Sequence, residues 1–146
     1  MATFHFKLEQ VRIYRKRLEE EAMQKLALAL AQRDALQKRL LDLENDLNAQ
    51  MQRLSRSDLL SSAERWLLQS YVKALKQEKH FCAKALDEAD NMVDIRRAEL
   101  TQKARERDLL DTLKTKQAAR HALLERQEER KNNDETATLR YRPAAV

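Results

Sequence analysis

Apolar positions in the first half of the chain recur with the spacing of a helix that packs against another helix. From Ala22 onward they advance by alternating steps of four and three residues, and Gln50 is the one skipped position. This spacing keeps one face of an α-helix against a partner helix. The members of this first seam are Ala22, Leu26, Ala29, Arg33, Leu36, Leu40, Leu43, Leu47 and Leu54. Because an apolar face of this kind is not stable in water, it predicts a partner.

The partner is expected within the same chain, because a second seam of the same kind follows. Its members are Leu68, Val72, Leu75, Cys82, Leu86, Ala89, Val93 and Leu100. Residues 54–62 between the seams are rich in serine, whose side chain competes with helical hydrogen bonds. Ser61 and Glu64 have the spacing of a capping box, which predicts a new helix there. A short connection makes long helices antiparallel neighbours, so the predicted fold is all-α, a two-helix antiparallel coiled coil or helical hairpin.

The seams also set the expected boundaries of the elements. We expect one antiparallel coiled coil over residues 1–140, followed by a disordered tail at 141–146. Within it, the expected elements are a helix at 4–55 capped by Thr3, a turn at 56–61 and a second helix at 62–135. The second helix is the longer one and is expected to overhang the first.

Folding the chain at the turn predicts which residues face one another. Leu43 is expected near Val72, in the middle of both seams. By the same register Phe4 lies opposite about Thr112, so the second helix has no partner from Leu113 onward. A single projecting helix of this kind is only marginally stable unless another protein receives it.

The amino-acid composition is typical of long helices, and it also indicates the cell compartment in which the protein is expected. Charged residues form 36% of the 146 residues, aromatic residues form 5%, glycine is absent and Pro143 is the one proline, which leaves little for a rounded core with tight turns. The single cysteine, Cys82, excludes an internal disulfide and is expected to be a small buried apolar residue. Neither a signal peptide nor a membrane-crossing run is apparent, so a soluble intracellular protein is expected.

The sequence offers no candidate for catalysis, for a cofactor or for a metal. Phosphate-binding loops need glycine, which this chain lacks. The three histidines, His5, His80 and His121, lack the spacings of helical zinc or di-iron sites. No catalytic arrangement of a serine, a histidine and an acidic residue can be proposed on an elongated helical hairpin. The chain is therefore expected to act by binding other proteins and not as an enzyme.

Three stretches carry a resemblance to a known family: Phe4 to Arg12, Arg65-Trp66 just after the turn, and Lys131 to Ala137, which looks like a K-x-x-D-E-x-A ending. Their order and spacing resemble those of the FliJ family, the small coiled-coil subunits of the flagellar protein export apparatus. The length and the longer second helix are also similar, so the resemblance covers nearly the whole chain.

The resemblance implies a stalk similar to that of rotary ATPases. Such a stalk is seated with its two chain ends in the central pore of the hexameric export ATPase FliI, where it promotes ring assembly and coupling. The resemblance also implies contact with the export gate protein FlhA and with export chaperones. The implied location is cytoplasmic and peripheral to the inner membrane at the flagellar base, with membrane association only through the export apparatus.

The residues of this chain that match the two binding regions of the family follow from the same resemblance. Those that match the basic ATPase-binding positions are Arg12, Arg15, Arg126, Arg130 and Lys131. Those that this chain offers in the gate-binding region are Trp66, Tyr71, Val72 and Leu75.

Three alternative functions can be distinguished from a flagellar export stalk. A YscO-like stalk of a virulence-type secretion system shares the shape, but the Phe-x-Phe-x-Leu-Glu opening favours the flagellar branch. A self-associating coiled-coil scaffold is separated from a monomeric stalk by sedimentation. A coiled coil that binds nucleic acid needs a concentrated basic face, whereas acidic residues interleave with the basic ones along the second helix, so no nucleic-acid partner is expected.

Overall fold

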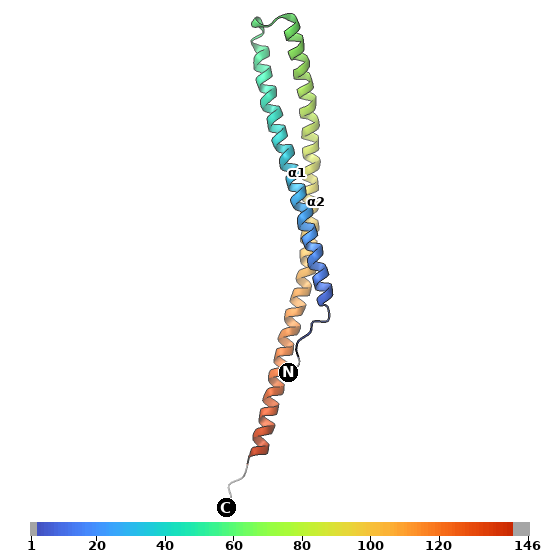
Figure 1. Cartoon of the computed structure of the whole chain (residues 1–146), viewed down its shortest axis with the longest axis vertical. Helices are drawn as coiled ribbons and strands as arrows, with labels where there is room; N and C mark the ends of the chain where they lie inside the picture. Colours follow the sequence, from blue (N-terminus) through green and yellow to red (C-terminus); the bar gives the residue numbers. More distant parts are fainter. Residues whose placement is uncertain (1–2, 142–146) are drawn as a thin grey trace, which may run out of the picture. The chain divides into compact units, whose positions relative to one another are not determined.

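A computed structural model describes residues 3–141, apart from the side chain of Ser57. Its elements are α1 (Glu9–Ser55), the short 3-10 helix η1 (Ser57–Leu59) and α2 (Ser62–Arg140). The 47 residues of α1 and the 79 residues of α2 run in opposite directions (Figure 1). The predicted all-α antiparallel helical hairpin with a longer second helix is confirmed.

The start of α2 is fixed by the predicted capping box. The backbone N–H of Glu64 donates to Ser61 Oγ at 3.2 Å, and the N–H of Ser61 donates to the Glu64 carboxylate at 3.4 Å. Each side chain thus satisfies a backbone donor that the first helical turn leaves without a partner. On the other side of the turn, Ser55 Oγ donates to the Gln52 carbonyl at 2.6 Å, where α1 ends.

The other two helix ends differ from the expected ones. The first helix begins at Glu9 and not at Phe4, because the N–H of Glu9 donates to the Phe6 carbonyl at 3.1 Å and residues 3–6 stay outside regular structure. A carboxylate in the first turn also suits the positive end of the helix dipole.

At the other end, α2 continues past residue 135 to Arg140. Asn132 and Asn133 cost the helix only fractions of a kcal/mol (about 0.7 at most), and neither glycine nor proline follows them before Pro143. Of the tail predicted at 141–146, only Tyr141 belongs to the described residues; the rest lies outside them.

The chain divides into two compact units. One comprises Glu20–Gln102, and we call it the turn unit. The other comprises Met1–Glu19 and Lys103–Val146, and we call it the terminal unit.

The turn unit is held by the two seams. Its buried apolar residues are Ala22, Ala29, Leu43, Leu47, Leu68, Val72, Leu75, Cys82 and Val93, all of them seam positions. Leu43, Val72 and Leu75 belong to one cluster, against which Leu40 packs, so the register predicted around Leu43 is right. A side-chain hydrogen bond joins the two helices beside this core: the Tyr71 hydroxyl donates to the Asp46 carboxylate at 2.8 Å. The core therefore follows the periodicity of the sequence.

In the terminal unit the predicted register is wrong. The ring of Phe4 lies 5.6 Å from that of His121, nine residues beyond the expected Thr112. The shift is already present in the helical part of the unit: Glu9 pairs with Lys114 and Arg12 with Asp111, each seven residues beyond the position that the predicted register gives. The non-helical residues before α1 therefore account only for the two further residues at Phe4. Among the described residues, every side chain from Arg126 to Arg140 is exposed, and we call this segment of α2 the overhang.

Candidate functional site

Arg12, predicted to bind the ATPase, is held inside the terminal unit by two carboxylates. Its Nε and Nη2 donate to the two carboxylate oxygens of Glu9 at 3.1 and 2.8 Å, and its Nη1 donates to Asp111 at 3.1 Å. All three nitrogens of the guanidinium are therefore bonded, and 23% of the side chain is exposed. Arg12 joins α1 to α2 and presents little charge outward.

The bonds of Arg12 belong to a longer chain of alternating charges. Asp111 also accepts from Arg107 Nη1 at 2.7 Å, and Arg107 Nε donates to Glu19 at 2.6 Å. At the other end, Lys114 Nζ donates to Glu9 at 2.9 Å. We call these residues the terminal ion-pair network: Lys114, Glu9, Arg12, Asp111, Arg107 and Glu19. The network crosses between the helices three times within the first turns of α1.

The network shifts the pKa values of its own members. The pKa of Glu9 falls to about 2, mainly because Arg12 and then Lys114 donate to its carboxylate. Bonds from Arg107 and Arg12 lower the pKa of Asp111. The same bonds raise the pKa of both arginines, because they favour the charged guanidinium. Glu9, Asp111, Arg12 and Arg107 are therefore charged at neutral pH.

Arg15 has a similar place. Its Nη1 donates to the carboxylate of Glu106 on α2 at 2.9 Å, and 36% of its side chain is exposed. Arg12 and Arg15 both lie in the terminal unit, and both face the neighbouring helix. Sequence reasoning missed their acidic partners, because identifying them requires the register of the terminal unit.

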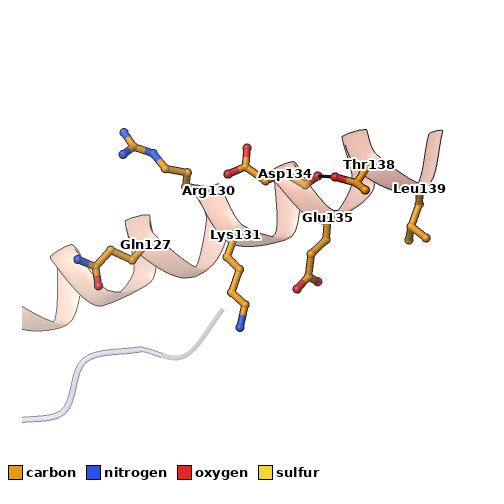
Figure 2. A pocket seen from close by; sticks show the side chains of 7 residues that line it. All are labelled: Gln127, Arg130, Lys131, Asp134, Glu135, Thr138 and Leu139. Atoms are coloured by element: carbon orange, nitrogen blue, oxygen red, sulfur yellow. Dashed lines mark hydrogen bonds between the residues drawn. The ribbon is translucent and has the colours of Figure 1, made fainter. Parts of the chain in front are cut away.

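Arg126, Arg130 and Lys131 lie on the overhang, and all three are exposed. They are at least fifteen residues beyond Asp111, which is about 22 Å along a helix, so the structure does not bring them together with Arg12. Figure 2 shows that Arg130 and Lys131 project from different sides of α2, with Asp134 on the side of Arg130. The five predicted ATPase-binding residues therefore form two separate groups.

Helical geometry adds one residue that was not predicted. At about 100° per residue, Arg126, Arg130 and Arg140 fall within an arc of about 80°, and Lys131 falls outside it. We call these three the arginine face of the overhang; Asn133 and Ala137 lie between them. Its signal was present in the sequence, as basic residues separated by four and ten positions.

An open hollow follows the neighbouring side of the overhang (Figure 2). Its lining residues are Gln127, Arg130, Lys131, Asp134, Glu135, Thr138 and Leu139. Leu139 is 86% exposed. The lining thus mixes both signs of charge with one exposed apolar side chain, which is a surface for a protein partner more than for a small ligand.

The residues predicted to bind the gate separate by burial. Val72 and Leu75 are 6% and 4% exposed, because they belong to the core of the turn unit. Tyr71 is 45% exposed, but its hydroxyl donates to Asp46 on α1, which raises the pKa of Tyr71. Trp66 is 66% exposed. Of the four, Trp66 is thus the one whose side chain is largely open to a partner.

Two leucines near Trp66 were missed. Leu59, in the connection, is 87% exposed and Leu67 is 61% exposed. Both fall outside the seam positions, which was the signal available in the sequence. With Trp66 they are exposed apolar side chains of the connection and the first turns of α2, and we call these three residues the turn surface.

The described residues include no group of three or more histidine, cysteine or acidic side chains that could hold a metal ion. Neither described helix contains a stretch apolar enough to span a bilayer.

Comparison with known proteins gives one match. Residues 4–145 fit the family model described as Flagellar FliJ protein, which is nearly the whole chain. No curated protein and no solved structure matches.

Proposed function

The chain belongs to the FliJ family, and on this basis we propose that it is the non-enzymatic stalk of the flagellar type III export apparatus. Family membership itself makes the chain a component of flagellar protein export. The proposal adds three finer functions: the stalk binds the centre of the hexameric ATPase FliI, promotes its ring assembly and coupling, and links the ring to the gate protein FlhA. Export chaperones are further proposed partners.

The overhang is the observation that carries the proposed contact with the ATPase. All side chains of residues 126–140 are exposed, so this segment of α2 has no partner among the described residues. A single α-helix is about 10–12 Å wide with its side chains, which suits insertion into the pore of a ring. The arginine face would meet acidic groups or backbone carbonyls there, since arginine donates to both.

Arg12 and Arg15 have a supporting function in this proposal. Because both donate to carboxylates of α2, they hold the start of α1 against the helix that carries the overhang. We assign the direct ATPase contact to Arg126 and Arg130, with Arg140 on the same face and Lys131 beside it.

The turn surface is the proposed contact with the gate. Tryptophan side chains dominate the binding energy of many interfaces because they bury a large area. Leu59 lies in the connection, and Trp66 and Leu67 lie in the first turns of α2. Val72 and Leu75 support this surface from within the core and do not contact the gate themselves.

The test is a crossed binding experiment with two double variants and two purified partners. In the first variant, Arg126→Glu and Arg130→Glu reverse the arginine face. In the second, Trp66→Ser and Leu67→Ser remove apolar area from the turn surface. We expect the first variant to lose ATPase capture and stimulation but to keep gate binding. We expect the second to lose gate binding but to keep the ATPase.

A charge control separates a local effect from the loss of net positive charge. Lys73→Glu and Lys76→Glu change the net charge by the same amount at exposed positions of the turn unit, and ATPase capture should be retained. If the arginine-face variant still stimulated ring formation at full strength, the proposed pore contact would be wrong. Sedimentation of the unaltered chain as a stable oligomer would instead favour the self-associating scaffold.

A further inference from the structure

We propose that the terminal unit is a salt-sensitive latch, in which residues 3–19 detach from α2 as ionic strength rises while the turn unit stays paired. This property goes beyond the proposed function, because it concerns the opening of the hairpin and requires neither the ATPase nor the gate.

The two units differ in what joins their helices. All nine buried seam residues lie in the turn unit. Among the described residues of the terminal unit, Phe6 is the one buried apolar side chain. Its helices are instead bridged by ion pairs. Those between the start of α1 and α2 are Glu9–Lys114, Arg12–Asp111, Arg15–Glu106 and Glu19–Arg107.

These ion pairs lie within eleven residues of α1, and the network links three of them through shared side chains. Asp111 bonds both Arg12 and Arg107, and Glu9 bonds both Arg12 and Lys114. A connected network contributes more than isolated surface pairs do, but it remains subject to screening. Its side chains are 13–37% exposed, so mobile ions reach them.

Apolar packing responds to salt in the opposite direction. The Debye length falls from about 30 Å at 0.01 M to about 3 Å at 1 M salt, which screens exposed charges. Burial of apolar surface is not weakened by salt in this way and is strengthened by some salts. Salt therefore weakens the terminal unit and leaves the seams of the turn unit intact.

Hydrogen exchange of the full-length chain measures this directly, because a helix end that leaves its partner frays and exchanges. We expect protection of residues 9–19 to fall about tenfold from low salt to 1 M sodium chloride, the size expected for several weak pairs. Protection of residues 36–47 should stay constant. Sucrose in place of salt should leave both segments protected.

A variant shows whether the network is the cause. Arg107→Met removes the cation that joins Glu19 to Asp111 and keeps a long, helix-favouring side chain. It should open residues 9–19 already at low salt and reduce the response to salt. Arg97→Met, an exposed arginine of α2, is the matched control and should behave like the unaltered chain.

The opposite results would overturn the latch. Protection of residues 9–19 that does not respond to salt, or that is unaffected by Arg107→Met, means that ion pairs do not hold the unit. If Phe6→Ala opened the unit while salt did not, the apolar anchor would be what holds it.

Discussion

The core of the turn unit gives the sharpest stability prediction. Leu43 is 3% exposed at the centre of the cluster that includes Leu47, Val72 and Leu75. Leu43→Ala removes three carbon atoms and leaves a cavity, which in protein cores costs about 2–5 kcal/mol. A seam between only two helices is open to solvent along both flanks and can partly collapse. We therefore expect the free energy of unfolding to fall by about 2–3 kcal/mol.

Leu41 is the matched control, because it lies two residues away on the same helix and is 56% exposed. Leu41→Ala removes the same atoms from the solvent face and should cost less than about 0.5 kcal/mol. Urea unfolding followed by far-UV circular dichroism measures both variants. The midpoint should shift for Leu43→Ala at an unchanged slope. Equal losses for the two variants would refute the assignment of the first seam as the buried face.

Two further predictions concern the ends of the helices. Because the pKa of Glu9 is lowered from 4.5 to about 2, its ion pairs stabilise the fold fully above pH 4.5 and are lost as pH falls toward 2. Carboxyl NMR should show Glu9 titrating well below pH 4.5. The Lys114→Met variant should raise the pKa of Glu9, because it removes one of the two donors to the carboxylate. Ser61→Ala removes the capping hydroxyl and should destabilise the chain by about 1 kcal/mol in thermal unfolding, whereas Ser62→Ala, one residue later, should not.

The way in which the charged residues pair explains why the candidate sites were only partly predictable. Arg12 and Arg126 look alike in the sequence, as basic residues near the two ends of a coiled coil. In the structure Arg12 is bonded to Glu9 and Asp111, whereas Arg126 is exposed on the overhang. An ion pair between helices depends on how α1 packs on α2, which the residues around each arginine in the sequence do not state.

The two leucine-rich seams and the capping box determined the hairpin from the sequence alone. Both signals are local: a repeat of alternating four and three residues states which face is buried, and Ser61 with Glu64 states where α2 starts. The predicted core around Leu43 followed from them and is confirmed. The burial of Val72 followed from them as well, although the family resemblance placed it on the gate surface.

Tertiary structure alone decided how the terminal unit is built. Residues 3–8 leave the helix, Phe6 is buried and Phe4 reaches His121, so the overhang begins about thirteen residues later than the register predicted. No periodic pattern signals this, because it depends on where a non-helical segment packs on a helix more than one hundred residues away in sequence. Periodicity determines which faces pair, and packing over long sequence separations determines where the pairing ends.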